Sequence, residues 1–261
     1  MTGRIERGHR ALMVWNDNPA KRNALSGSYY ETLQQGLAQA AADGDIGAVI
    51  LAGEGGYFCS GGDLEALATR RDLPKRERAD LVERLHDVIR AIRDCPAPVI
   101  AAVEGGAAGA GFALAMACDV VIAAEGAEFA ASYVRAGLTP DGGLTHALSR
   151  SLAPQTVLPL LLTGDPVTAE RLLSLGAVSE IAPPGETVAR AQTLANRLGH
   201  GPREAQVRIK RLAHAARAAS LDEQLVAERD SMARAQGGPE AEEGISARLE
   251  KRQPEFGRLR K

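Results

Sequence analysis

Short apolar runs alternate with helical stretches along most of the chain, and this alternation constrains the fold more than any other feature. The apolar runs are bounded by glycine or polar residues, which favours buried strands, and the stretches between them repeat apolar residues at helical spacing. Strands separated by helices pair in parallel. The pattern therefore predicts an α/β fold, either a doubly wound sheet or a spiral of strand-helix turns. The predicted strands are residues 47–53, 98–103, 120–124 and 177–181, and the predicted helices are residues 28–42, 81–93 and 110–117.

The two ends of the chain have a different character. Residues 4–6 and 11–15 predict two short strands around a turn at Gly8, followed by a polar loop. The last quarter of the chain shows only helical patterns. We therefore divide the chain into a core of residues 1–185, which would hold the functional site, and a helical region of residues 186–261, which would mediate assembly.

Charge and cysteine content disfavour several classes of function. The formal net charge is -2, which predicts no nucleic-acid partner and no membrane partner. Cys59, Cys95 and Cys118 are odd in number and widely spaced, without a CxxC motif, so neither a disulfide framework nor a zinc site is expected. Residues 1–10 lack the apolar stretch of a signal peptide. We expect a cytoplasmic protein without a metal site.

Two glycine-rich segments, residues 53–64 and 105–112, each follow a predicted strand and precede a helical stretch. Glycine permits close approach of the backbone to a ligand, and free N–H groups at a helix start bind negative charge. Two such turns side by side could supply two donors to one oxyanion, although either segment alone is more typical of a tight turn. Neither is followed by Gly-Lys-Ser/Thr or forms a clean GxGxxG fingerprint, so a nucleotide cofactor is disfavoured.

Five segments, in chain order, resemble the enoyl-CoA hydratase/isomerase, or crotonase, family. They are residues 18–25 (NPAKRNAL), 57–64 (YFCSGGDL), 98–111 (PVIAAVEGGAAGAG), 137–143 (GLTPDGG) and 243–256 (EGISARLEKRQPEF). The family usually has Asn where Glu104 stands. The resemblance covers nearly the whole chain, and five ordered motifs are far more specific than either glycine-rich turn alone.

The resemblance implies a crotonase-type spiral of ββα repeats with a helical C-terminal trimerisation region. It implies an acyl-CoA substrate, in which coenzyme A is part of the thioester, with no separate cofactor and no metal. It also implies self-association to a homotrimer or hexamer.

The resemblance further assigns roles to individual residues. The thioester carbonyl oxygen would lie between the backbone N–H groups of Gly62 and Ala110, because charge develops on that oxygen during the reaction. Lys21 and Arg22 would contact the coenzyme A phosphates. Asp63 is also a helix cap by residue type and position. The other positions along the coenzyme A path are Ala24, Ser60, Gly61, Asp63 and Leu64.

The placement of carboxylates indicates the reaction. Hydratases of this family use two glutamates, and the corresponding positions here are Ala113 and Tyr133. Asp141 stands where several branches, isomerases above all, place their working carboxylate. One carboxylate is sufficient to move a double bond. The resemblance therefore favours an enoyl-CoA isomerase with Asp141 as proton shuttle, although Asp before Gly-Gly is also typical of a turn.

Two other interpretations stay open. His86, on the edge of the apolar stripe of residues 81–93, could act with Asp141 as in the aryl-CoA dehalogenase branch, giving hydrolytic, dehalogenase-like or hydratase chemistry on an acyl- or aryl-CoA. In either kind of enzyme, Tyr133 would form an aromatic wall for a flat acyl group. The chain could instead be a non-catalytic acyl-CoA binder. The acyl group itself would be selected by a loop over residues 64–81.

Overall fold

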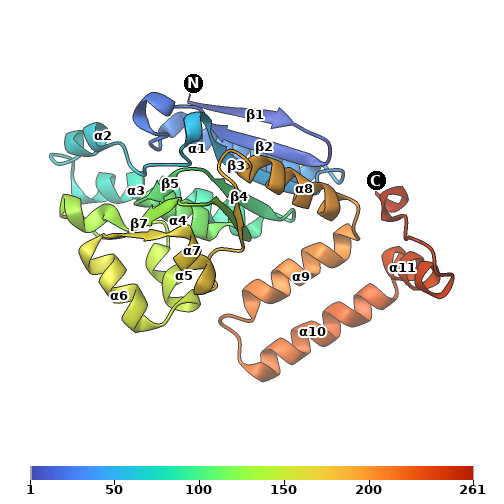
Figure 1. Cartoon of the computed structure of the whole chain (residues 1–261). Coiled ribbons are helices and arrows are strands. Elements are labelled where there is room, and N and C mark those ends of the chain that lie inside the picture. The colour runs from blue at the N-terminus through green and yellow to red at the C-terminus, as the bar shows by residue number, and fades with distance from the viewer. Residues whose placement is uncertain (1, 261) are drawn as a thin grey trace.

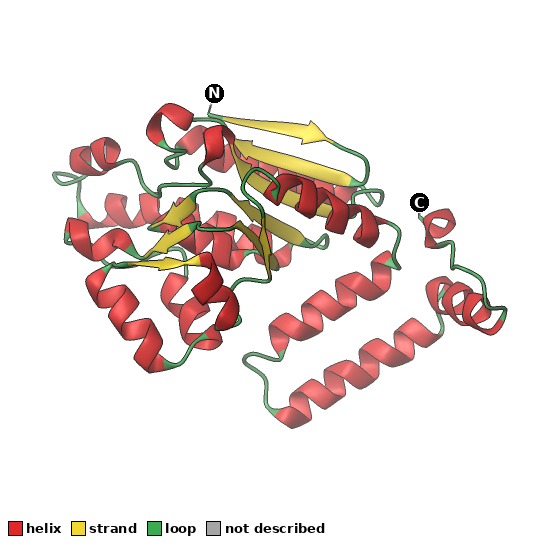
Figure 2. Ribbon diagram, viewed as in Figure 1, coloured by secondary structure: helices red, strands yellow, loops and turns green. Residues whose placement is uncertain are grey.

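The computed structural model describes residues 2–260 and contains two sheets (Figures 1 and 2). The larger sheet has six strands in the order β1-β2-β3-β4-β6-β9. Strands β1 and β2 pair antiparallel, as two strands around the turn at Gly8 require, and the other neighbours pair in parallel. The strands are β1 (Gly3–Arg7), β2 (Ala11–Asn16), β3 (Ala48–Gly53), β4 (Val99–Val103), β6 (Val120–Ala124) and β9 (Glu180–Ala182).

The smaller sheet has three strands, β5 (Gly106–Ala108), β7 (Glu128–Ala130) and β8 (Pro166–Thr168), in the order β5-β7-β8. The chain passes from β4 to β5 and from β6 to β7, so successive turns contribute one strand to each sheet. A bridge between Cys59 and Ala107 brings the segment after β3 onto the same sheet. A doubly wound sheet would not repeat in this way, and the predicted spiral of ββα turns is confirmed.

Helices surround the two sheets. Figure 1 shows α8 crossing one face of the larger sheet, while α1, α3 and α4 lie on the opposite side. The helices are α1 (Gly27–Ala42), α2 (Leu64–Thr69), α3 (Lys75–Asp94), α4 (Ala110–Ala117), α5 (Leu144–Ser151), α6 (Pro154–Thr163), α7 (Ala169–Ser174), α8 (Thr187–Gly199), α9 (Arg203–Ala215), α10 (Leu221–Gln236) and α11 (Pro239–Leu249), with short 3-10 turns at η1 (Pro19–Lys21), η2 (Glu54–Gly56), η3 (Ser132–Ala136) and η4 (Phe256–Leu259).

The core depends on small aliphatic side chains because aromatic residues make up only 3% of the chain. Helix α4 lies at its centre, with every residue except Met116 buried. A helix that is apolar on all sides is expected only where protein surrounds it. Phe112 on this helix packs against Phe129 of β7, with ring centroids 5.2 Å apart, and thus joins α4 to the smaller sheet. This packing fixes the start of α4, which belongs to the second glycine-rich segment.

The hydrogen bonds of Glu104 explain why a carboxylate suits the position where the resembling family usually has Asn. Its Oε1 accepts hydrogen bonds from the backbone N–H groups of Gly185 (3.1 Å) and Thr187 (3.2 Å) and from the Thr187 hydroxyl (2.8 Å). A carboxylate at this position satisfies N–H groups at the start of α8. Glu104 therefore anchors α8 over the larger sheet, where α8 contacts β3, β4 and β6.

Beyond α8, the helices α9, α10 and α11 extend away from the body of the molecule (Figure 1). Lys210 of α9 is buried, and its Nζ contacts Asp119 Oδ2 at 2.7 Å and the carbonyl oxygens of Ile92 (3.1 Å) and Ala97 (3.2 Å). His214 Nε2 lies 2.8 Å from the other oxygen of Asp119. This ion cluster attaches α9 to the core. The division of function between residues 1–185 and 186–261 stays a prediction.

Three sequence expectations need correction. Residues 64–81, expected as a loop that begins with a helical stretch, form α2 and the first part of α3 throughout most of their length. The extent of these helices was missed because their exposed turns carry charge and lack the apolar periodicity that reveals a buried face. The strand expected at residues 177–181 is β9, which begins at Glu180, because Ala177 and Val178 still donate hydrogen bonds to Leu172 in the turn after α7. The short strands β5, β7 and β8 were not expected. Within residues 2–260, no helix is long and apolar enough to cross a membrane.

Candidate active site

Backbone hydrogen bonds bring the two glycine-rich segments side by side. Ala108 donates its N–H to the carbonyl oxygen of Cys59 at 2.9 Å, within the bridge between Cys59 and Ala107. The first loop joins them, because Leu25 donates its N–H to the carbonyl oxygen of Gly61 at 2.8 Å. Three segments that are far apart in the sequence therefore meet at one edge of the smaller sheet.

Gly61 shows how close this approach is. Its φ is +92°, and a Cβ at this position would lie 2.6 Å from the Ala108 carbonyl oxygen and 3.2 Å from the Ala110 nitrogen. Only glycine fits both the backbone conformation and the space. Gly62 follows directly, so its peptide lies beside the start of α4. Among the hydrogen bonds within residues 2–260, none is donated by the N–H of Gly62 or of Ala110. The two N–H groups are therefore neighbouring, unpaired donors.

Asp141 and Tyr133 form a hydrogen-bonded pair. The Tyr133 hydroxyl donates to Asp141 Oδ1 at 2.9 Å and lies 3.5 Å from the Asp141 carbonyl oxygen. Burial raises the pKa of the Asp141 carboxyl, while the Tyr133 hydrogen bond and the charges of His86 and Arg70 lower it. Burial and the negative charge of Asp141 hold the pKa of Tyr133 well above its usual value. The phenol is therefore a protonated donor at neutral pH.

The turn that carries Asp141 lies on α4. Gly142 has a φ of +59°, and a Cβ there would lie 2.8 Å from the Cβ of Ala113 and 3.1 Å from the Leu85 side chain. Ala113 is one helical turn beyond Ala110, on the same face of α4. The helix face that begins with the unpaired Ala110 N–H thus continues to the Asp141 turn. Tyr133 reaches the same place from η3, whose first residue, Ser132, lies beside Gly109.

His86 lies on α3 at the edge of this arrangement. Its Nδ1 is 3.1 Å from Glu83 Oε2, and Glu83 is in turn paired with Arg90. His86 makes no hydrogen bond with Asp141 within residues 2–260, but its charge is close enough to lower the pKa of Asp141. The structure therefore brings His86 into the electrostatic surroundings of Asp141 without direct contact.

Lys21 and Arg22 are engaged by neighbouring side chains. Lys21 Nζ contacts Asp63 Oδ2 at 2.8 Å and Glu65 Oε2 at 2.7 Å. The Arg22 guanidinium lies 4.1 Å from the centroid of the Tyr57 ring. Both cations thus lie beside the first glycine-rich segment, as a coenzyme A contact would require, but a phosphate would have to compete with two carboxylates for Lys21.

The other predicted coenzyme A positions surround the same segment. Asp63 is the N-cap of α2, and its carboxylate accepts hydrogen bonds from the N–H groups of Glu65 and Ala66, so the predicted helix cap is confirmed. The Ser60 hydroxyl donates to the Lys21 carbonyl oxygen at 3.1 Å. Ala24 is buried, whereas Leu64 exposes 67% of its surface. The large exposed side chain of Leu64 next to the glycine-rich turn leaves an apolar surface free, as the predicted coenzyme A path would require.

Two residues near the site escaped the sequence interpretation. Asn23 is buried with a φ of +57°, and its amide donates to the carbonyl oxygens of Glu54 (2.8 Å) and Tyr57 (2.5 Å). Asparagine in a polar loop is a signal for this left-handed conformation. Tyr30 lies close enough to Asp141 for the carboxylate charge, after burial, to raise the pKa of the phenol. Its helical periodicity predicts only core packing, so no sequence signal pointed to the site.

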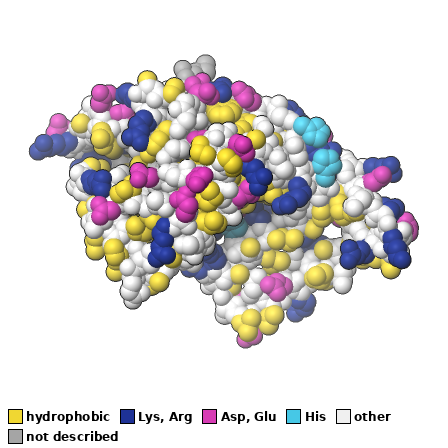
Figure 3. Space-filling model, in the orientation of Figure 1, with side chains coloured by type: hydrophobic (Ala, Val, Ile, Leu, Met, Phe, Trp, Pro, Cys, Tyr) yellow, Lys and Arg dark blue, Asp and Glu magenta, His cyan; other side chains and the backbone are white. Residues whose placement is uncertain are grey.

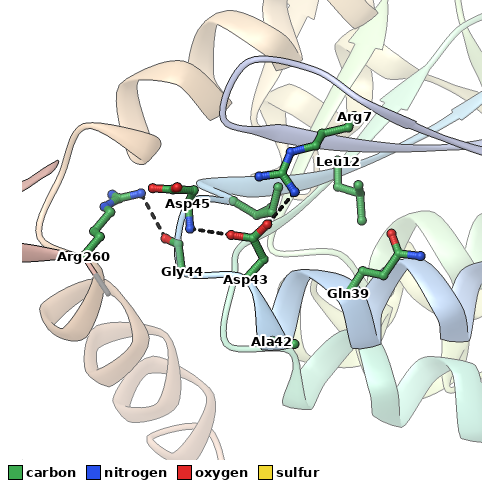
Figure 4. A pocket seen from close by; sticks show the side chains of 9 residues that line it. Arg7, Leu12, Gln39, Ala42, Asp43, Gly44, Asp45 and Arg260 are labelled. Carbon is green, nitrogen blue, oxygen red and sulfur yellow. Dashed lines mark hydrogen bonds and ion pairs between the residues drawn. The ribbon is translucent and has the colours of Figure 1, made fainter.

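Two cavities contain none of the predicted site residues. One, of about 480 Å³, lies at the end of α1. Figure 4 shows Arg7 turned toward Asp43 there, and Arg260 toward the carbonyl oxygen of Gly44, at 3.2 Å. The other, of about 630 Å³, lies between α8, α9 and the ion cluster around Asp119. Within residues 2–260, no three His, Cys, Asp or Glu side chains converge as metal ligands would.

The arrangement combines two neighbouring backbone donors at a helix start with the turn that carries Asp141, which lies against Ala113 one helical turn further on. The model of the enoyl-CoA hydratase/isomerase family matches residues 11–259 of the chain. The chain therefore belongs to the enoyl-CoA hydratase/isomerase family, and the resemblance found in the sequence is confirmed.

Individual relatives agree over the full length. A probable enoyl-CoA hydratase of Rhodobacter capsulatus is 36% identical over 98% of this chain and 97% of its own. The 1,2-epoxyphenylacetyl-CoA isomerase of Escherichia coli is 33% identical over 97% and 96%, respectively. The crystal structure of an enoyl-CoA hydratase from Polaromonas has a TM-score of 0.94, is 40% identical and covers 97% of this chain and 98% of that one. Most of these similar proteins are named as hydratases.

Proposed function

We propose that the protein is an enoyl-CoA isomerase that moves a double bond into conjugation with the thioester, with Asp141 as the proton shuttle. One observation carries this proposal. The turn that holds Asp141 lies against α4, on the helix face that begins at Ala110. At the two positions where the family's hydratases have glutamates, this chain has Ala113 and Tyr133. Neither side chain can act as a carboxylate base.

The N–H groups of Gly62 and Ala110 would receive the thioester oxygen. When a proton leaves carbon 2 of a 3-enoyl thioester, the electron pair moves toward the carbonyl group and negative charge grows on its oxygen. Preorganised donors stabilise that charge by roughly 2.7–4 kcal/mol each, judged from the loss of one such donor in other enzymes. Neither N–H is occupied by a protein acceptor within residues 2–260, which suits a ligand oxygen.

A single carboxyl group can complete the reaction. The Asp141 carboxylate takes the proton from carbon 2, which leaves a dienolate held at the oxyanion site. The protonated carboxyl then returns that proton to carbon 4, and the double bond moves to the position between carbons 2 and 3. No proton or electron is gained or lost overall. Burial raises the pKa of Asp141, which strengthens the carboxylate as a base.

The names of relatives leave the reaction type open, because most are hydratases and one is an isomerase. The residues of this chain favour isomerisation, because the two-glutamate route of hydration needs two carboxylates that this chain does not have at Ala113 and Tyr133. Hydration through Asp141 alone would need a second group to position water. His86 is the available group.

A hydrolytic or dehalogenase-like reaction is the second candidate. One observation favours it: Glu83 binds Nδ1 of His86 at 3.1 Å and so orients the ring as the third member of a catalytic set would. In that reaction the Asp141 carboxylate would attack the aryl carbon and displace halide, or attack the thioester carbonyl and displace the coenzyme A thiolate. His86 would take a proton from the water that hydrolyses the resulting aspartyl intermediate and restores the carboxylate. A non-catalytic acyl-CoA binder is the third candidate, and it makes no use of Asp141.

We also propose that the acyl-CoA enzyme assembles as a homotrimer or a hexamer through α9–α11. These helices expose large apolar side chains, and Figure 3 shows hydrophobic groups gathered on the arm they form. Unpartnered apolar surface of this extent favours a protein interface. The exposed residues are Ile209, Leu221, Leu225, Val226, Met232, Ile245 and Leu249.

Ultraviolet-monitored conversion of a 3-enoyl-CoA to its conjugated 2-enoyl form tests the isomerase. Wild type should convert the substrate, and Asp141→Asn should lower kcat by about 10²–10⁴, the usual contribution of a general base. Release of coenzyme A or halide from aryl-CoA substrates, lost in His86→Ala, would instead identify the hydrolytic enzyme. Tight acyl-CoA binding that is unchanged in Asp141→Asn, with no turnover of any substrate, would identify the binder.

A further inference from the structure

The Tyr133 hydroxyl occupies one of the two oxygens of Asp141. It donates to Oδ1 at 2.9 Å, and no other side chain donates to this carboxylate within residues 2–260. No other residue within 2–260 donates to Oδ2, although the N–H of Asp141 itself is close enough to the carboxylate to lower its pKa. A carboxylate that a phenol binds at one oxygen is asymmetric, and the oxygen without the phenol is the one that can accept a proton.

Tyr133 is held firmly enough to impose this asymmetry. Its side chain is buried in the main core, with 9% exposure. Its carbonyl oxygen accepts the N–H of Leu138 at 3.0 Å, which closes the turn leading to Asp141. The preceding residue, Ser132, lies against Gly109 at the start of α4. The phenol is thus fixed relative to both the carboxylate and the helix that supplies the Ala110 N–H.

We propose that Tyr133 is a positioning residue, whose hydroxyl holds Oδ1 of Asp141 and so presents Oδ2 as the single oxygen that moves the proton. The inference rests on the proposed function, because it gives Asp141 a proton to carry. It replaces the role of Tyr133 as a simple aromatic wall. A Phe would fill nearly the same volume, so only the hydroxyl distinguishes the two roles.

The hydrogen bond has a second consequence, which can be measured. Burial raises the pKa of Asp141, and the Tyr133 hydrogen bond opposes that rise. The phenol stays protonated because its own pKa is far above neutral. Tyr133 therefore keeps the buried carboxyl ionised, and able to act as a base, at a lower pH than the pocket alone would allow.

The test is the pH dependence of kcat/KM for Tyr133→Phe with a 3-enoyl-CoA. Removing the hydroxyl should move the acid limb to higher pH. On that limb kcat/KM should fall about tenfold relative to wild type. A tenfold change corresponds to roughly 1.4 kcal/mol, which is close to the weakest hydrogen bonds made to charged groups. At high pH, Asp141 is ionised in wild type and in Tyr133→Phe alike, so the difference in kcat/KM should shrink to about threefold or less. An equal loss at every pH would overturn the proposal, because that is the signature of a structural defect.

Tyr30→Phe is the matched control. Tyr30 is also a phenol near Asp141, but no hydrogen bond joins the two within residues 2–260. Removing its hydroxyl should leave the acid limb in place. A shift in Tyr30→Phe as large as that in Tyr133→Phe would mean that burial of any nearby phenol, and not the Tyr133 hydrogen bond, sets the behaviour of Asp141, and the proposal would fail.

An infrared titration separates this inference from the proposed function. Protein labelled with ¹³C-aspartate, differenced against Asp141→Asn, reports protonation of Asp141 without any substrate. A higher midpoint in Tyr133→Phe than in wild type supports the positioning role even where no isomerase activity is found. An unchanged midpoint overturns it even where the isomerase is active.

Discussion

Gly142 lies directly against Ala113, so that a Cβ on Gly142 would come within 2.8 Å of the Ala113 Cβ. The sequence resemblance assigns Ala113 to a glutamate position of the family's hydratases, and Gly142 follows Asp141 in the chain. The turn that brings Asp141 to the site therefore uses the space over α4 that a longer side chain at 113 would need. The absence of a carboxylate at Ala113 and the placement of Asp141 therefore follow from the same packing of the turn against α4.

Ala113→Glu should consequently fail to create a hydratase. The new side chain would be forced against Gly142, whose φ of +59° leaves little freedom to move. Overpacking of this kind costs about 1–3 kcal/mol, and a buried carboxyl without a partner adds to that cost. We expect a lower melting temperature, loss of isomerase activity and no hydration of a 2-enoyl-CoA. Ala113→Gln, of nearly equal volume but uncharged, should be destabilised less. A stable, active hydratase would disprove the packing argument.

The sequence predicted the fold well where protein encloses a segment and its residues are therefore apolar. The strands over residues 98–103 and 120–124 and helix α4 agree with the structure because each is enclosed by protein. Prediction failed where tertiary contacts decide. Strand β5, with only three residues of glycine and alanine, exists because Cys59 and β7 pair with it. The exposed first half of α3 has no apolar face to reveal it.

The candidate site divides in the same way. Family motifs located Gly62, Ala110 and Asp141, whose surroundings the structure then brought together. No pattern could foresee that Tyr133 donates to Asp141, because a hydrogen bond between residues in η3 and the following turn depends on how that turn closes. The pairing of Lys21 with Asp63 and Glu65 was likewise invisible, since it joins positions about 40 residues apart in sequence across two loops.

Ala110→Pro tests the backbone donor at the start of α4. Proline is tolerated at the first position of a helix, and it removes the N–H while its ring occupies the direction in which that N–H pointed. We expect kcat to fall by about 10²–10³, as for the loss of one oxyanion donor, with the far-ultraviolet circular dichroism unchanged. Ala110→Ser keeps the N–H and should stay within a few-fold of wild type. Full activity in Ala110→Pro would exclude this residue from the oxyanion site.

Asp141→Asn should stabilise the protein at neutral pH while it lowers kcat by the amount expected for loss of a general base. Burial raises the pKa of Asp141, so the folded protein binds its proton more tightly than the unfolded chain does, whose aspartates titrate near about 3.9. Stability from this group is therefore lost as pH rises from that value through the raised pKa, and it stays reduced above it. Melting curves should show Asp141→Asn above wild type at pH 8, with a difference that narrows toward pH 4. A variant less stable than wild type at pH 8 would contradict the pKa direction.

The apolar surface of the arm predicts a concentration-dependent assembly. Leu225 and Met232 of α10 expose 52% and 62% of their surfaces, and charges there would oppose burial against another copy. Light scattering should give the mass of three or six chains for wild type and a smaller species for the double variant Leu225→Asp and Met232→Asp. Leu162→Asp on α6, which is at least as exposed but lies outside the arm, serves as the matched control. A wild-type monomer at high concentration would refute the assembly proposal.

Lys210→Met should weaken the attachment of the arm to the core. Lys210 Nζ contacts Asp119 Oδ2 at 2.7 Å and two carbonyl oxygens. The variant therefore leaves Asp119 with His214 and the Val99 N–H as its partners among the described residues. Removing one partner of a buried ion pair costs about 3–5 kcal/mol of unfolding free energy. The matched control is Arg190→Met, which breaks an exposed pair with Glu180 and should cost less than about 1 kcal/mol.

Denaturant unfolding measures the free energy of both variants. Adding Asp119→Asn to Lys210→Met should recover part of the lost stability, because it removes the unpaired charge. Equal, small effects of the two single variants would show that α9 is held by its apolar contacts and not by the ion cluster.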